Sequence, residues 1–202
     1  MPSPIKVFSD WVISGKDEGM QKGHSPAVKN MIEYSTKELN DYSFIDAGCG
    51  NGWVVRRVRS IKNCYNACGV DGAQMMISKA LKIDPKGNYI HTDLGSWRPK
   101  EKVDIVHSME AVYYLTNPKE FIRNVYTSWL NDGGRIIIGL DFYEENTVSH
   151  SWPEDCGVSI MSLLSEKQWI DFFTSAGFRE IESWRVDKKT NWAGTLVITG
   201  LK

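Results

Sequence analysis

The turn DAGCGNGW (residues 46–53) constrains the fold of this chain more than any other stretch. It follows the short apolar run YSFIDAG (42–48), which predicts a buried strand. It precedes NGWVVRRVRSI (51–61), whose apolar residues fall on one helical face. Glycines at alternate positions indicate a backbone that approaches a ligand closely. The stretch therefore predicts a strand, a binding turn and a helix.

The same alternation continues along the chain. Further strands are predicted at 65–71, 88–94, 103–108 and 135–143, with helices at 73–82 and 118–130 between them. A capped helix at 165–178 precedes two apolar strands that form an antiparallel hairpin. The pattern predicts an α/β fold: a Rossmann-like three-layer αβα sandwich with a mostly parallel seven-stranded sheet and an antiparallel C-terminal hairpin strand.

Composition excludes several classes of protein. The formal net charge is −1 over 202 residues, so no basic surface predicts nucleic-acid binding. The four cysteines form no CxxC pair, which argues against a zinc site and against a disulfide framework. No apolar run is long enough to span a bilayer, and the first residues lack a signal-peptide core. We expect a cytoplasmic protein that contacts no membrane and holds no metal.

Three acids follow successive predicted strands. Asp46 stands at the mouth of the glycine turn, where a carboxylate would repel a pyrophosphate. Asp71 lies roughly twenty residues past the glycines, where a carboxylate commonly accepts hydrogen bonds from ribose. Asp93 ends the third strand, so all three should face one crevice. Because Trp53 occupies the place of the third glycine in a dinucleotide fingerprint, a nicotinamide dehydrogenase is the disfavoured alternative.

Five motifs in order resemble those of the class I S-adenosylmethionine-dependent methyltransferases of the small-molecule type. DAGCGNG resembles their first motif, and GVDGAQMMISKA resembles the segment after the second strand. HTDL, VDIVHSMEAVYYL and LNDGGRIIIG resemble the segments of the third, fourth and fifth strands. The resemblance implies one methyltransferase domain over 1–202, with a helical cap (1–40), a cofactor-binding half (41–143) and an acceptor-side part (144–202).

The resemblance also implies contacts to the cofactor, S-adenosylmethionine. Asp46 and the backbone of Gly48 and Gly50 would face its methionine part, and Asp71 would hold its ribose. Carboxylates suit the sulfonium and ammonium charges of this ligand.

Around the adenine, the resemblance places Met76 near the ring and Asp93 at the adenine amino group. Leu94 would cover the ring or offer its backbone NH. His107 would offer its main-chain carbonyl to an amino group of the cofactor. Gly72 stands where the family has an apolar residue, so the packing on one adenine face must come from elsewhere.

Methyl transfer is an in-line displacement that needs a base only when the bound nucleophile is protonated. We select Glu110 and His24 as the catalytic candidates. The other titratable side chains at the ends of strands four and five or in loops are Tyr113, Tyr114, Asp141, Tyr143 and His150. His24 precedes an expected helix start at Ser25-Pro26; it is either a lid residue, with Trp11 and Met20, or a local capping histidine.

We expect the acceptor to be a small molecule methylated on nitrogen or oxygen, with residues 144–162 covering its pocket. Acids and aromatics near this pocket favour a cationic or aromatic acceptor. A protein methyltransferase and a non-catalytic S-adenosylmethionine-binding protein remain alternatives, and we expect a monomer or weak homodimer. Whether Trp53 contacts the cofactor or the core stays open.

Overall fold

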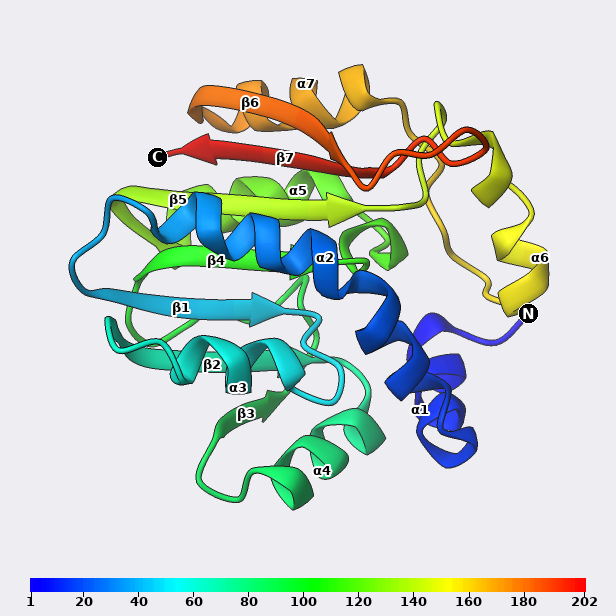
Figure 1. Cartoon of the computed structure of the whole chain (residues 1–202), viewed down its shortest axis with the longest axis horizontal. Helices are drawn as coiled ribbons and strands as arrows, with labels where there is room; N and C mark the ends of the chain where they lie inside the picture. The colour runs from blue at the N-terminus through cyan, green and yellow to red at the C-terminus, as the bar shows by residue number, and fades with distance from the viewer.

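The computed structural model describes all 202 residues and contains one mixed sheet with the strand order β3-β2-β1-β4-β5-β7-β6 (Figure 1). Strands β1 to β5 are parallel, whereas β7 runs antiparallel to both β5 and β6. The strands are β1 (Tyr42–Ala47), β2 (Cys64–Asp71), β3 (Asn88–His91), β4 (Val103–Met109), β5 (Leu130–Leu140), β6 (Arg179–Val186) and β7 (Thr195–Leu201). The predicted seven-stranded sheet and its antiparallel end are confirmed.

Helices cover both faces of this sheet. The α-helices are α1 (Pro4–Ser14), α2 (Lys16–Thr36), α3 (Trp53–Arg59), α4 (Gln74–Ile83), α5 (Pro118–Asn124), α6 (Trp152–Cys156) and α7 (Glu166–Ala176). Short 3-10 turns lie at Val112–Tyr114 (η1) and Thr147–Ser149 (η3), and a π-helical turn, η2 (Val125–Trp129), extends α5. α2, α3 and α4 contribute to one apolar core, and α5 and α7 to the other. The predicted three-layer sandwich is confirmed.

Alternation along β1 explains how one strand serves two cores. Tyr42 and Phe44 belong to the core under α2, α3 and α4, whereas Ile45 and Ala47 belong to the core under α5 and α7. Successive side chains of a strand point to opposite faces, so a strand covered on both faces is apolar throughout. All six residues of β1 are buried, as such a strand requires.

The ends of α7 follow the sequence signals. Ser165 accepts a hydrogen bond from the Gln168 amide, and the Gln168 side chain accepts one from the Ser165 amide. This capping box satisfies backbone donors at the first turn. Gly177 closes the helix at φ 103°, in the left-handed region that glycine adopts without a steric penalty.

The structure corrects three local predictions. α2 runs through Ser25-Pro26 without a new start. The burial of its apolar face on the sheet stabilises the helix by more than the loss of the backbone hydrogen bond that Pro26 cannot donate. Residues 131–134 (NDGG) are a bulge within β5 and not a free turn: the β4–β5 register shifts between Val103 and Ile105. The third strand ends at His91, three residues early.

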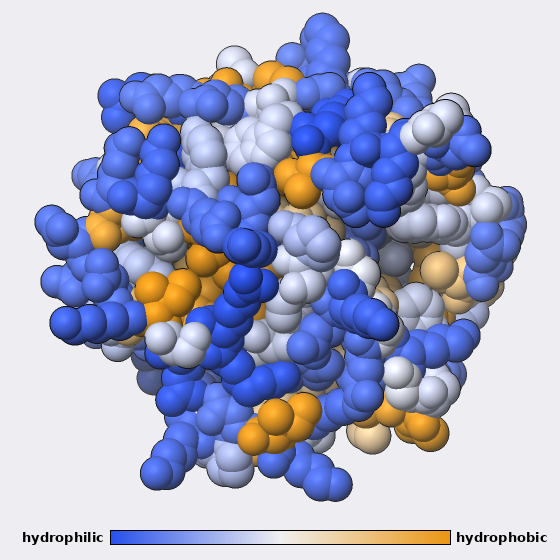
Figure 2. Space-filling view, viewed as in Figure 1, coloured by the Kyte–Doolittle hydropathy of each residue, from blue (hydrophilic) through white to orange (hydrophobic).

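The carboxyl ends of the parallel strands meet at one edge of the sheet, and α1 and the start of α2 lie over that edge (Figure 1). The face seen in Figure 2 is mostly hydrophilic, with scattered apolar side chains. None of the helices combines the length and the apolar character that crossing a membrane requires.

Candidate functional site

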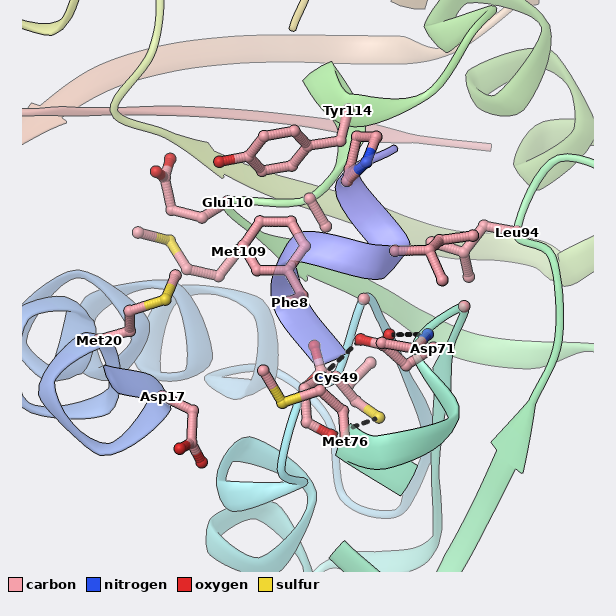
Figure 3. A pocket seen from close by; sticks show the side chains of 18 of the residues that line it. Phe8, Asp17, Met20, Cys49, Asp71, Met76, Leu94, Met109, Glu110 and Tyr114 are labelled. Atoms are coloured by element: carbon pink, nitrogen blue, oxygen red, sulfur yellow. Dashed lines mark hydrogen bonds between the residues drawn. The ribbon is translucent and has the colours of Figure 1, made fainter. Parts of the chain in front are cut away.

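A cavity of about 360 Å³ lies at the carboxyl edge of the sheet, beneath α1 and α2. This is a usual size for a small-molecule site. Figure 3 shows side chains from the N-terminal helices facing those of the sheet edge across this cavity. The predicted residues that line it are His24, Asp46, Gly48, Gly50, Asp71, Gly72, Met76, Asp93, Leu94 and Glu110. Nearly every predicted site residue therefore meets at one place.

The glycine turn has the backbone shape that the sequence indicated. Gly48, Gly50 and Gly52 have φ angles of 82°, 51° and 78°. A β-carbon on Gly48 would lie 2.2 Å from the Cβ of Ala111, so this position has no room for a side chain. The turn packs directly against the segment after β4 and leaves its backbone exposed to the cavity.

Asp71 joins the two turns that follow β1 and β2. Its Oδ2 accepts a hydrogen bond of 2.8 Å from the Gly50 amide, and its Oδ1 accepts one of 2.7 Å from the Ala73 amide. Burial raises the pKa of the Asp71 carboxyl above its ordinary value, and the two amides oppose that rise. The carboxylate thus fixes both turns and lines the cavity.

Asp46 is held by His107. The Nδ1 of His107 lies 2.8 Å from Oδ1 of Asp46, and both side chains are almost fully buried. His107 sits within β4, behind Asp46, and does not line the cavity. His107 is thus the one predicted site residue outside the cavity lining, whereas Met109 and Glu110, further along the chain, reach the cavity.

The residues expected around the adenine also line the cavity. Met76, Asp93 and Leu94 line it, from α4 and the turn after β3. Ile5 of α1 supplies the apolar group that Gly72 lacks: its Cδ1 lies 3.1 Å from where a Gly72 β-carbon would be. Because a larger residue at 72 would displace Ile5, the glycine and the helix complement each other.

Glu110 lies at the end of β4 with the uncommon φ of 56°. Its carboxyl accepts hydrogen bonds from the Tyr113 hydroxyl and the Asp141 amide. Burial, and then the neighbouring Asp141 carboxylate, raise the pKa of Glu110 well above its ordinary value. Strained, buried carboxyl groups of this kind concentrate at functional sites.

His24 approaches the same point from α2. Its Nε2 lies 3.5 Å from Oδ2 of Asp141, whose Oδ1 accepts a hydrogen bond of 2.6 Å from the Thr195 hydroxyl. Burial lowers the pKa of His24, and the Asp141 charge opposes that shift. Burial likewise raises the pKa of Asp141. A neutral imidazole beside a carboxylate is suited to accepting a proton.

One ligand atom from each of His24, Glu110 and Asp141 lies within 4.8 Å of the others, a spacing that a metal ion could use. Both oxygens of Glu110 already accept hydrogen bonds from Tyr113 and Asp141, and one oxygen of Asp141 accepts from Thr195. These hydrogen bonds hold the two carboxyl groups in place beside His24.

Two of the three residues expected from the N-terminal helices line the cavity. Met20 and His24 line the cavity, but Trp11 does not; Phe8, one turn earlier in α1, takes that place and packs edge-on against Trp11 at 5.1 Å. From the expected cover at 144–162, only Ile160 reaches the cavity.

Trp53 lies between the cavity and the core. It lines the cavity, and its ring also packs against the core under α2, α3 and α4.

Sequence reasoning missed Asp17 and Asn51. Both are buried lining residues, and the Asn51 amide donates a hydrogen bond of 2.9 Å to Oδ2 of Asp17. Oδ1 of Asp17 is buried without a partner. No local signal could reveal this pair, because only the packing of α2 on the glycine turn brings the residues together.

The fold and the site together define a Rossmann-like nucleoside-binding enzyme core. The profile of the methyltransferase domain family matches residues 20–183. The chain belongs to this family of class I S-adenosylmethionine-dependent methyltransferases, and S-adenosylmethionine is the cofactor of that class.

Individual relatives are distant. The trans-aconitate 2-methyltransferase of Klebsiella pneumoniae is 23% identical over 70% of this chain and 57% of its own length. The tRNA U34 carboxymethyltransferase of Tolumonas auensis is 24% identical over 76% of this chain and 52% of its own. The chain thus spans little more than half the length of these curated relatives.

Two solved structures share the fold over nearly the whole chain. One is a putative methyltransferase from Haloferax volcanii in complex with the Trm112 methyltransferase activator. Its TM-score is 0.85 at 24% sequence identity, and the superposition includes 100% of this chain and 98% of the other. A possible histamine N-methyltransferase from Thermotoga maritima has a TM-score of 0.74 and 16% identity, with 98% of both chains covered.

Proposed function

We propose that this protein transfers the methyl group of S-adenosylmethionine to a nitrogen or oxygen atom of a small-molecule acceptor. The observation that carries the proposal is the charge of the cavity. Its lining includes five carboxylates (Asp17, Asp46, Asp71, Asp93 and Glu110) and contains no lysine or arginine. Such a lining suits a nucleoside that bears a sulfonium and an ammonium, and disfavours a pyrophosphate.

The residues present fit the cofactor in two parts. Gly48 and Gly50 leave room for its methionine portion beside Asp46, and Asp71 accepts hydrogen bonds from ribose hydroxyls. This contact follows from the position of Asp71 at the end of β2, the usual place for a ribose-binding acid.

The adenine lies between Ile5 and Met76 in this proposal. Asp93 accepts from its amino group, and Leu94 covers the ring. The side chains of Ile5 and Met76 both line the cavity.

The bound cofactor supplies an electrophilic methyl carbon on a good leaving group. The protein's own contribution is therefore to orient the acceptor, exclude water and accept a proton. Phe8 and Met20 close the cavity from above. Glu110 and His24 lie at the acceptor end, and His24 accepts the proton when the nucleophile carries one.

Ligand binding tests the proposal directly. A ligand that binds the folded state raises the melting temperature by mass action. We expect S-adenosylmethionine and S-adenosylhomocysteine to raise it and NAD to leave it unchanged. Release of S-adenosylhomocysteine with an acceptor then separates an enzyme from a non-catalytic binding protein. A shift with NAD alone would contradict the proposal.

A second candidate is a macromolecular acceptor recognised with a partner protein. The Haloferax volcanii neighbour is bound to an activator, and a hollow beside the cofactor cavity is lined by Lys22, Lys29, Arg56 and Lys79. This hollow shares Gln21 and Asn51 with the cavity. Co-purification with a Trm112 protein, and methylation of tRNA or protein only in its presence, would favour this candidate.

A further inference from the structure

We propose that the acceptor of this enzyme is an amine, and that Asp141 positions His24 to take the proton from its nitrogen. The inference rests on the proposed methyltransferase function and narrows its substrate class. It depends on three observations: the charge at the acceptor end of the cavity, a pair of aromatic rings there, and the fixed geometry of Asp141.

Charge excludes an anionic acceptor. The acceptor end is formed by Glu110, His24 and the Asp141 carboxylate behind them, whose ligand atoms lie within 4.8 Å of one another. Because the cavity has no lysine or arginine, a carboxylate acceptor would find no permanent positive side-chain charge there. The acceptor class in the name of the Klebsiella pneumoniae relative, trans-aconitate, is therefore unsuited to this cavity.

Two aromatic rings complete a site for an ammonium group. Phe8 of α1 and Tyr114 of η1 pack edge to face at 4.9 Å, and both line the cavity. Figure 3 shows Tyr114 with its hydroxyl end toward Glu110, and Phe8 beside Met109. Aromatic faces attract cations, and a nearby carboxylate adds to that attraction. An alcohol would use neither feature.

Asp141 is held so that one oxygen remains for His24. The Thr195 hydroxyl donates to Oδ1, and the Asn146 side-chain amide donates a hydrogen bond of 2.7 Å to the Asp141 carbonyl. Oδ2 then lies 3.5 Å from Nε2 of His24. Asp141 is thus a positioning residue that acts through the histidine, because it lies outside the cavity lining.

Other charged groups near His24 are few. Asp187 and Lys189, from the segment between β6 and β7, line a neighbouring hollow with His24 and Asp141. They pair with each other at 3.1 Å, so their charges largely cancel. Burial therefore lowers the pKa of His24, and the Asp141 carboxylate is the charge that opposes this shift.

The reaction balances with these groups alone. The bound ammonium gives one proton to His24 and becomes a neutral amine. Its lone pair forms the new nitrogen–carbon bond, while the electron pair of the breaking carbon–sulfur bond moves to sulfur and cancels the sulfonium charge. The product is a methylated ammonium ion and S-adenosylhomocysteine. The imidazolium returns its proton to solvent when the product leaves.

The test compares matched probes of one carbon skeleton. With saturating S-adenosylhomocysteine, binding is measured for 2-phenylethylamine, 2-phenylethanol and phenylacetate, and for n-butylamine, 1-butanol and butyrate. In at least one skeleton, we expect the amine to bind at least ~10-fold more tightly than its alcohol and acid, as one charged hydrogen bond predicts. Equal or tighter binding of the alcohol or acid in both skeletons overturns the inference. Failure of S-adenosylhomocysteine itself to bind would instead contradict the proposed function.

Variants then test the role of Asp141. Asp141→Asn should reduce the amine preference to less than ~3-fold, whereas His150→Asn, at an exposed histidine outside the cavity, should keep it. Binding of S-adenosylhomocysteine to each variant reports folding. If Asp141→Asn does not fold, Thr195→Val serves instead, because it removes the hydrogen bond that holds the Asp141 carboxylate but keeps the carboxylate itself. An unchanged amine preference in the folded variant overturns the inference.

The pH dependence of kcat/KM distinguishes a positioning role of Asp141 from a purely structural one. Asp141 stabilises protonated His24, so removing its charge lowers the pKa of the imidazole. The acid limb of kcat/KM for the preferred amine should therefore move to lower pH in Asp141→Asn, and stay in place in His150→Asn. An acid limb that does not move shows that Asp141 does not act through His24.

Discussion

Oδ2 of Asp17 in α2 lies 2.7 Å from the Nζ of Lys79 in α4, and this ion pair joins the two helices beside the cavity that Asp17 lines. The Asp17 side chain is only 3% exposed. The hydrogen bond that the Lys79 ammonium donates to Asp17 raises the pKa of Lys79 above its ordinary value. The lid is therefore fixed by charge as well as by apolar packing.

Asp17→Asn should destabilise the protein by about 2 kcal/mol, because it removes the buried negative charge that pairs with Lys79. Glu18→Gln is the matched control: Glu18 also pairs with Lys79, at 3.1 Å, but is 72% exposed. Its loss should cost less than about 0.5 kcal/mol. Urea unfolding of both variants measures the difference, and equal losses would show that the buried contact has no special role.

Gly48→Ala should lower the free energy of unfolding far more than Gly133→Ala does. Both glycines have nearly the same φ, 82° and 80°, so both substitutions carry the same backbone strain of about 1–2 kcal/mol. Only at Gly48 would the new methyl group collide with Ala111, and nothing lies within 4 Å of the corresponding position at Gly133. Overpacking should add about 1–3 kcal/mol. Thermal unfolding tests this, and similar melting temperatures would contradict it.

Asp71→Asn should weaken binding of S-adenosylhomocysteine by about 10- to 100-fold, the loss expected for hydrogen bonds to a charged group. The asparagine keeps one acceptor oxygen but cannot hold both the Gly50 and Ala73 amides as Asp71 does. Isothermal titration calorimetry measures the change. Asp132→Asn, at a 98% exposed site, should bind as the wild type does, and a comparable loss there would point to a general effect.

Glu110 should make the protein less stable as pH rises. Its folded pKa is raised by burial and by Asp141, so the folded state holds the proton more tightly than the unfolded chain. The favourable contribution is complete below its ordinary pKa of about 4.5 and is lost as pH rises above it, through the folded value. Asp141, whose pKa is also raised, acts in the same direction.

Glu110→Gln should therefore lose less stability than the wild type between about pH 5 and pH 8. Chemical denaturation across that range tests the sign. A steeper decline in the variant would mean that Glu110 is ionised in the folded protein without penalty.

Local sequence was sufficient for much of this molecule. Apolar periodicity located every strand of the sheet, and Ser165 and Gly177 marked the ends of α7, because these signals act within a few residues. The acids after β1, β2 and β3 were placed in one crevice by topology alone, since parallel strands end at the same edge.

Tertiary packing decided the rest. The sequence placed a helix start at Pro26, but burial of the α2 face on the sheet carries that helix through the proline. His107 was expected at the cofactor, and the register of β4 against β1 puts it behind Asp46 instead.

The sequence by itself determined the class of fold and the composition of the cofactor turn, because strand alternation and the glycine spacing are encoded locally. Only the tertiary structure brought Ile5 to the gap beside Gly72, and His24 to Asp141. These partners lie far apart in the chain, and no local pattern sets the distance between them. It is set by how α1 and α2 pack over the edge of the sheet.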